Sequence, residues 1–299
     1  MKCFYHSADL DGHCSGAIVR HRFPECEMIG INYGDSFPWN IIQKEDTVYM
    51  VDFCLQPFGD MLRLADSCKS LILIDHHKST QQEINNLSVE AFNRPGFTTF
   101  VDMDYAGCEL TWKFLYELVY QGLPGESYPS MPKTVYYLGR YDIWKHEDNP
   151  DILAFQYGMR VYETDPSNEY SKAVWNDIFD DYPPALEKII REGYLILKYI
   201  RSDNVKYATQ TAFDINFQGH KTICINRAQC NSQLFDSVYD PEKHDIMMPF
   251  YRNKNGTWTV SLYTTHDHID CSEIAKKMGG GGHKKAAGFQ IDNLNKIGL

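Results

Sequence analysis

Short apolar runs in the first quarter of the chain have the length of buried strands. They cover residues 3–5, 48–51 and 71–74. The stretches between them carry helix signals, one from about residue 14 to 23 and one opened by Gln56 and Pro57. Because strands and helices alternate in this way, the pattern predicts a parallel sheet covered by helices, which is an α/β fold.

The middle of the chain predicts further helices. Apolar residues keep helical spacing over residues 107–120 and again over residues 131–141. Residues 149–184 are aromatic and acidic and follow no clear period, so no element is predicted there. A helical pattern then runs from Pro184 to about residue 202, and we expect this helix to connect two domains.

The last part of the chain changes character. Short alternating segments predict strands at residues 209–213, 222–225 and 257–263. A turn is expected at 253–256, a helix at 272–278 and a final strand at 288–291. The predicted domains are residues 1–184, a connecting helix over 185–204, and a smaller α/β domain over 205–299.

Composition narrows the class of protein. The chain has 299 residues, 43% of them hydrophobic, which is enough for a large core and favours two domains. No apolar run reaches the length of a membrane helix and the N-terminus leads into a strand, so a cytoplasmic location is expected. The nine cysteines are scattered without C-x-x-C spacing, which indicates neither a disulfide framework nor a zinc knuckle.

The net charge of −11 argues against binding of long duplex nucleic acid, which needs a basic face. Carboxylates that hold divalent metals would offset part of this charge. A short anionic substrate that binds locally is compatible with it. The sequence leaves the oligomeric state open, and a homodimer is compatible with it.

Each of the three apolar runs ends in residues that can bind a metal. These residues are His6, Asp9, Asp11, Asp52, Asp75, His76 and His77. A single Asp after a strand is usually a turn former or a helix N-cap. A carboxylate and two imidazoles at one strand end would be costly without a cation, however. Because the carboxyl ends of parallel strands share one edge of a sheet, the three groups together predict a metal site.

A glycine run near the C-terminus is the second strong signal. Residues 279–282 are all glycine and are followed by His283 and Lys284. Glycines let the backbone present several N–H groups to an oxyanion, and the imidazole and the lysine add charged donors. A flexible linker is the alternative, but such linkers usually have polar neighbours and lie between domains. The pattern favours an anion-binding loop.

Together these motifs resemble the DHH phosphoesterase superfamily with its DHH-associated C-terminal domain. The first motif, the second acid, the Asp-His-His triplet and the glycine run with its histidine stand in the family's order and span nearly the whole chain. The chain looks most like the short oligoribonuclease or nano-RNase branch, some of whose members also cleave linear or cyclic dinucleotides. The resemblance implies two lobes, a dinuclear and usually manganese centre in the first, and an active site in the cleft between them.

The resemblance also implies which residues hold two divalent ions. One ion would be bound by His6, Asp9 and Asp52, and the other by Asp11, Asp52, His76 and Asp142. Manganese is the expected metal, with magnesium and cobalt as the alternatives. Asp142 ends an apolar helix-like stretch, and Asp102 and Asp104 compete with it for the fourth acidic position. Ligation by His6 stays open, because its motif is one residue shorter than in the pyrophosphatase branch.

Catalytic and substrate-binding roles complete the implied site. His77 and Asp75 are the expected catalytic residues, and His77 would contact the scissile phosphate or orient a metal ligand. Substrate contacts are expected from Gly280, Gly281, Gly282, His283, Arg140, Arg252 and Lys284. For the three basic side chains among these, a solvated surface position is the competing interpretation.

Three functions remain in competition. The leading hypothesis is a metal-dependent phosphodiesterase that cleaves short oligoribonucleotides or dinucleotides, cyclic ones included, to nucleoside 5′-monophosphates. The second is a phosphomonoesterase or polyphosphate hydrolase acting on small anions such as 3′-phosphoadenosine 5′-phosphate. The third is a nucleotide sensor without turnover, against which the intact acids and imidazoles argue. The expected partner is a short RNA or dinucleotide, and neither a membrane nor a long duplex is expected.

Overall fold

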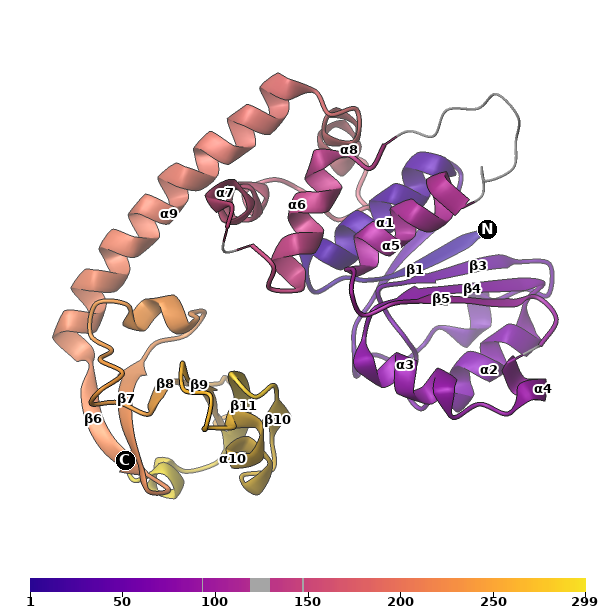
Figure 1. Ribbon diagram of the computed structural model, residues 1–299. Helices are drawn as coiled ribbons and strands as arrows, with labels where there is room; N and C mark the ends of the chain where they lie inside the picture. Colours follow the sequence, from indigo (N-terminus) through magenta and orange to yellow (C-terminus); the bar gives the residue numbers. More distant parts are fainter. Residues whose placement is uncertain (93, 119–129, 147) are drawn as a thin grey trace. The chain divides into compact units, whose positions relative to one another are not determined.

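A computed structural model of the chain describes residues 1–92, 94–118, 130–146 and 148–299 (Figure 1). The chain divides into two compact units, Met1–Ile196 and Leu197–Leu299. The first unit contains a parallel sheet and the second a mixed sheet, so the predicted α/β class is confirmed. Within these ranges, no helix is both long enough and apolar enough to cross a lipid bilayer.

The sheet of the first unit has five parallel strands in the order β2-β1-β3-β4-β5. These strands are β1 (Lys2–His6), β2 (Glu27–Ile31), β3 (Thr47–Val51), β4 (Ser70–Asp75) and β5 (Phe97–Val101). The three apolar runs of the sequence form β1, β3 and β4. Successive side chains of a strand point to opposite faces, so Cys3 and Tyr5 join one hydrophobic core and Phe4 joins the other.

Helices cover both faces of this sheet (Figure 1). The helices of the first unit are α1 (Leu10–Arg22), α2 (Gly59–Ser67), α3 (Lys78–Asn85), α4 (Val89–Phe92), α5 (Gly107–Trp112), α6 (Lys133–Asp142), α7 (Pro150–Met159) and α8 (Ser171–Phe179), with a 3-10 segment η1 (Trp39–Ile41) and a π-helical segment η2 (Lys113–Leu118). Of these, α6 and α8 pack against α1, and α7 packs against α6. Ile18 of α1, Leu110 of α5 and Trp175 of α8 pack in the core on one face. Met61 and Leu64 of α2 pack in the core on the other face.

The first unit differs from the sequence prediction in three segments. The helix expected from residue 14 begins at Leu10, because the Asp9 carboxylate caps it by accepting a hydrogen bond from the Gly12 amide (2.9 Å). The helix expected over 107–120 is α-helical to Trp112 and π-helical to Leu118, and residues 119–120 lie outside the described ranges. The stretch 149–184, where no element is predicted, contains α7 and α8.

The helix α9 (Pro183–Thr211) begins in the first unit and ends in the second. The prediction of a strand over 209–213 is wrong. Residues 209–211 belong to α9, and the first strand of the second unit starts only at Phe213. The hydroxyls of Thr209 and Thr211 each donate to the carbonyl four residues earlier, so these β-branched residues are accommodated in the helix. The domain ranges 1–184, 185–204 and 205–299 stay predictions.

The second unit has a six-stranded sheet in the order β10-β11-β9-β8-β7-β6, in which β7 and β8 are parallel and the other neighbours are antiparallel. Its elements are β6 (Phe213–Phe217), β7 (His220–Asn226), η3 (Ser232–Phe235), β8 (Ile246–Arg252), β9 (Trp258–Tyr263), α10 (Cys271–Lys277), β10 (Gly281–Gly282), β11 (Ala286–Ile291) and η4 (Leu294–Ile297). The predicted turn at 253–256 joins β8 to β9, and Gly256 adopts a φ of 90° there.

Candidate metal centre

The polar ends of β1, β3 and β4 lie at one edge of the parallel sheet. The strand register aligns Tyr5 with Val51, and Val51 with Ile74. The residues that follow these positions are His6, Asp52 and Asp75. All three are polar and lie at the same edge of the sheet. This is the arrangement that the sequence predicts for ligands at the carboxyl ends of parallel strands.

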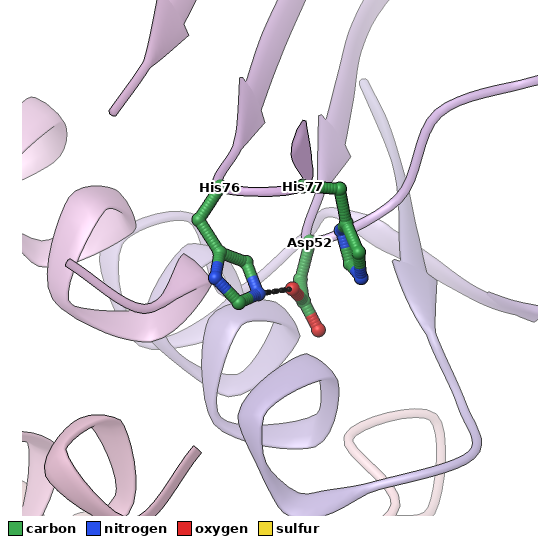
Figure 2. Close-up of side chains that lie close together, drawn as sticks. All are labelled: Asp52, His76 and His77. Carbon is green, nitrogen blue, oxygen red and sulfur yellow. Dashed lines mark ion pairs between the residues drawn. The ribbon is translucent and has the colours of Figure 1, made fainter. Parts of the chain in front are cut away.

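Asp52 lies in the middle of this edge. It is buried, with 1% of its surface exposed, and its backbone adopts a φ of 54°, in the left-handed region. Its Oδ1 is 3.1 Å from Nε2 of His76 (Figure 2), and its Oδ2 is 3.7 Å from Nδ1 of His6. The two carboxylate oxygens therefore face two different groups of residues, as a bridging ligand requires.

The first group consists of His6, Asp9 and Asp52, whose ligand atoms lie within 4.8 Å of one another. Nδ1 of His6 is 3.1 Å from Oδ2 of Asp9. The other oxygen of Asp9, Oδ1, caps α1 by accepting the Gly12 amide. The Asp9 carboxylate can thus serve both as the N-cap of α1 and as a metal ligand. The sequence alone does not decide between these two interpretations.

The second group consists of Asp11, His76 and Asp142, whose ligand atoms also lie within 4.8 Å of one another. Nε2 of His76 is 3.6 Å from Oδ2 of Asp11 and 3.4 Å from Oδ2 of Asp142. The Asp11 carboxylate accepts hydrogen bonds from the amides of Gly107 and Cys108, each 2.8 Å long. These amides begin α5 and hold Asp11 in place, while burial and the negative charge of Asp52 raise the pKa of its carboxyl well above the usual range.

Asp142 is the candidate for the fourth acidic position that joins the cluster. It is the last residue of α6 and faces His76. The competing residues, Asp102 and Asp104, are exposed in the turn after β5, where the Asp104 amide donates to the Asp102 carboxylate (2.9 Å). The geometry therefore favours Asp142 over both.

The electrostatics of the cluster fit a cation. Nδ1 of His6 and Oδ1 of Asp52 are buried and have no hydrogen-bond partner among the residues that the structure describes. Burial, together with the negative charge of Asp52, raises the pKa of Asp142 to about 7. The neighbouring carboxylates of Asp52 and Asp9 raise the pKa of His6 to about 10. Crowded acids thus compete for protons, and a divalent cation would relieve their repulsion.

His77 stands beside this cluster, and its ring lies next to the Asp52 carboxylate (Figure 2). Its Nδ1 bonds to Oδ1 of Asp75 (2.7 Å), which leaves Nε2 for another partner. Asp75 is fully buried, and it also accepts hydrogen bonds from the Thr80 hydroxyl and the His76 amide. Asp75 thus holds the His77 ring in one orientation, and the catalytic roles expected for both residues stay predictions.

Arg140, a predicted substrate contact, is engaged inside the first unit. Its guanidinium forms an ion pair with Glu109, and the side chains are 12% and 2% exposed, respectively. Glu109 also accepts the Ala106 amide (3.0 Å), just before α5. Arg140 therefore neutralises a buried carboxylate, and its expected contact with the substrate stays a prediction.

The predicted anion-binding residues lie in the second unit. Gly281 and Gly282 form β10, which pairs with β11, and Gly282 has a φ of 137°. A Cβ atom at Gly280 would lie 2.1 Å from the Gly288 carbonyl oxygen, so close strand packing also requires a glycine there. The side chains of His283, Lys284 and Arg252 are exposed. Packing thus explains part of the glycine run, and exposure leaves the basic residues accessible to a ligand.

Several contacts of the centre are missed by sequence reasoning. Thr80 holds Asp75 from the first turn of α3, and its helical spacing after the triplet is the signal that could have found it. Tyr33 is 44% exposed, and its ring centroid is 5.7 Å from that of His6 and 6.2 Å from that of His77. No local pattern marks Tyr33, because only the fold brings it to this edge.

Comparisons with known proteins agree with this architecture. The family model for the DHHA1 domain matches residues 232–298. Over 36 residues the chain is 61% identical to oligoribonuclease NrnB of Bacillus subtilis (strain 168), which covers 12% of this chain and 9% of that protein. Over 263 residues it is 21% identical to uncharacterized protein R106 of Acanthamoeba polyphaga mimivirus, covering 84% of this chain and 54% of that protein. The chain thus spans about half the length of R106 and a small part of the length of NrnB.

Two solved structures share the fold. The DHH domain of PF0399, a member of the s1p family of ribosomal proteins, has a TM-score of 0.59 and 12% identity, and the match covers 99% of this chain and 83% of that one. The pGpG-specific phosphodiesterase PggH of Vibrio cholerae has a TM-score of 0.53 and 10% identity, with 97% and 92% covered. The chain therefore carries a match to the DHHA1 domain, a short segment similar to an oligoribonuclease, and a fold shared with a DHH domain. Its second unit contains the DHHA1 domain.

Proposed function

We propose that this protein is a metal-dependent phosphodiesterase that hydrolyses short oligoribonucleotides or dinucleotides, cyclic ones included, to nucleoside 5′-monophosphates. The observation that carries the proposal is the position of Asp52, whose two oxygens face two groups of carboxylates and imidazoles. The similarity to an oligoribonuclease over a short segment, and the fold shared with a pGpG-specific phosphodiesterase, support nucleotides as the class of substrate.

The proposed cofactor is a pair of divalent ions. One would be held by His6, Asp9 and Asp52, and the other by Asp11, Asp52, His76 and Asp142. Carboxylate and imidazole donors without thiolates suit manganese, with magnesium or cobalt as the alternatives. Such a pair supplies an activated hydroxide and neutralises charge on the phosphoryl oxygens.

The side chains beside the ligands would prepare the substrate. Burial lowers the pKa of His77, but the hydrogen bond and the charge of Asp75 outweigh this effect and raise it. Because Nδ1 already donates to Asp75, the raised pKa favours a second proton on Nε2. In the proposed mechanism, Nε2 of His77 donates to an oxygen of the scissile phosphate, and Asp75 keeps the ring in that orientation.

The second unit is proposed to hold the rest of the substrate. Gly280, Gly281, Gly282 and His283 would contact a phosphate, and Arg252 and Lys284 would add positive charge. All of these residues lie within the DHHA1 match. We also propose a cytoplasmic location, and a homodimer stays an untested prediction.

A substrate panel tests the function. The wild-type protein with manganese is expected to release nucleoside 5′-monophosphates from pApA, pGpG and five-residue RNA, measured by chromatography. Asp52→Asn should lower the rate at least 100-fold, since even outer partners of a metal centre are worth roughly 10–100-fold. Asp104→Asn, which changes an exposed acid outside the cluster, is the matched control and should keep the wild-type rate.

Other outcomes of this panel would contradict the proposal. Release of orthophosphate from 3′-phosphoadenosine 5′-phosphate, without cleavage of dinucleotides, would favour the phosphomonoesterase. Tight nucleotide binding without turnover of any substrate would favour the sensor.

A further inference from the structure

A cavity of about 300 Å³ lies beside the candidate metal centre, within the first unit. The polar residues that line it are Asp9, His13, Gln156, Arg160, Tyr162 and Thr164. Asp9 belongs both to this lining and to the first ligand group. A molecule in the cavity would therefore adjoin whatever the metal centre holds.

The two faces of α7 explain why Gln156 reaches this cavity. A Cβ atom at Gly158 would lie 2.1 Å from the carbonyl oxygen of Ile189, and one at Gly193 would lie 1.7 Å from that of Ala154. The face of α7 that carries Ala154 and Gly158 thus packs against the α9 backbone. Gln156 is two residues, or about 200°, from each of them, so it occupies the opposite face. Arg160 follows one turn later.

Gln156, which lines this cavity, carries a buried acceptor without a partner in the described part of the chain. It is buried, with 7% of its surface exposed, and its Oε1 has no hydrogen-bond partner among the described residues. A buried acceptor without a partner destabilises the folded protein, because it has lost its hydrogen bonds to water. Stable proteins rarely accept this cost without a ligand or another functional reason.

The neighbouring polar groups are already engaged with one another. Nδ1 of His13 bonds to the Thr164 hydroxyl (2.9 Å), and its Nε2 bonds to the Ser7 carbonyl (3.2 Å). The Tyr162 hydroxyl donates to Glu192 (2.5 Å). These bonds fix the cavity walls and leave the Gln156 amide as the group that can select a ligand.

The charges of the cavity indicate what kind of ligand fits. Gln156 Oε1 is an unpaired acceptor among the described residues, so a ligand that satisfies it must donate a hydrogen bond. Phosphate and pyrophosphate offer chiefly acceptor oxygens and few O–H donors at neutral pH, so they match this acceptor poorly. A nucleoside offers ribose hydroxyls and, for most bases, an amino group, and a cavity of about 300 Å³ is at the lower end of ligand-pocket sizes. The Cζ atom of Arg160 lies 4.4 Å from the centroid of the Tyr157 ring. Its guanidinium adds positive charge for a phosphate attached to the nucleoside.

We propose that this cavity binds the ribose and base next to the scissile phosphate, and that Oε1 of Gln156 accepts a hydrogen bond from this nucleoside. The inference rests on the proposed phosphodiesterase function and deepens it, because it makes nucleotides, and not inorganic polyphosphates, the substrate. Gln156 is a binding residue in this scheme. It lies 147 positions from Asp9 in the sequence, in the segment where the sequence pattern predicts no element.

The test compares binding of AMP and of inorganic phosphate to the manganese-loaded full chain by titration calorimetry. Gln156→Leu is expected to weaken AMP binding about tenfold and to leave phosphate binding unchanged, since one hydrogen bond is worth about 1.4 kcal/mol here. In kinetics with pApA, KM should rise about tenfold while kcat stays within about twofold. Gln43→Leu, at an exposed glutamine outside the cavity, is the control and should behave as wild type.

Gln156→Met serves as a second variant, and thermal unfolding verifies that both variants fold. Equal AMP affinities in wild type and both folded variants would overturn the inference, and so would an equal loss of AMP and phosphate affinity. These outcomes are distinct from failure of the proposed function. AMP binding that depends on Gln156, in a protein that hydrolyses no phosphodiester, would support the cavity and overturn the hydrolase.

Discussion

At the scale of single residues, the candidate centre depends on how Asp52 is held. Its φ of 54° is unusual for a residue other than glycine and costs about 1–3 kcal/mol. The Asp52 amide donates to the Ile74 carbonyl of the neighbouring strand (2.8 Å), which fixes the backbone in this conformation. Backbone strain at a buried acid, between two groups of metal-ligand side chains, is more readily explained by function than by folding.

The pKa of Asp142 gives a pH prediction for the metal-free protein. Burial and the charge of Asp52 raise this pKa from 3.8 to about 7 in the folded state. The folded protein therefore holds the proton more tightly than the unfolded chain. The resulting stabilisation is complete below pH 3.8 and is lost as the pH rises through about 7. Urea unfolding in the presence of a chelator, from pH 4 to pH 8, should detect this loss.

Asp142→Asn is the matched comparison, because its amide cannot ionise. Relative to this variant, wild type should lose stability between pH 4 and pH 7 without metal. With manganese the sign should reverse, since the ion binds the ionised carboxylate and releases protons. If the stabilities of metal-free wild type and metal-free Asp142→Asn changed with pH in parallel, the proposed environment of Asp142 would be contradicted.

At the scale of elements, the start of α5 contacts two acidic residues of the candidate metal centre. Its first amides hold Asp11, and its first residue, Gly107, lies against Asp52. A Cβ atom at Gly107 would be 2.7 Å from Oδ1 of Asp52. The glycine is thus needed for the approach of a helix to a buried carboxylate.

Gly107→Ala is expected to displace Asp52 and to weaken manganese binding at least tenfold, in line with the cost of disturbing outer partners of a metal centre. Gly59→Ala is the control, because nothing lies within 4 Å of a Cβ atom at the start of α2. It should keep wild-type affinity and unfold at the same or a slightly higher temperature. Manganese titration of both variants decides the point, and equal affinities would remove the proposed role of Gly107.

Elements formed by one short, continuous apolar run could be predicted from the sequence. The strands β1, β3 and β4 form where expected, and their polar ends meet because parallel strands place carboxyl ends at one edge. The helix α7 escaped prediction, although Asn149 and Pro150 have the residue types of an N-cap and a first helical turn. Pairings between distant elements, such as Arg140 with Glu109, have no local signal and could not be predicted.

At the scale of the whole molecule, the two units carry two separate signals. The cluster of acids and imidazoles lies entirely in the first unit. The DHHA1 match lies entirely in the second unit. Because the two signals come from separate parts of the chain, neither accounts for the other. A net charge of −11, with several carboxylates gathered at one sheet edge, further suits a protein that binds divalent cations.

Anomalous diffraction from manganese-soaked crystals can show whether Asp52 bridges two divalent ions. We expect two manganese peaks, one against each oxygen of Asp52, with His6 and Asp9 beside one peak and Asp11, His76 and Asp142 beside the other. Absence of manganese from this edge of the sheet, or peaks that do not contact Asp52, would contradict this expectation.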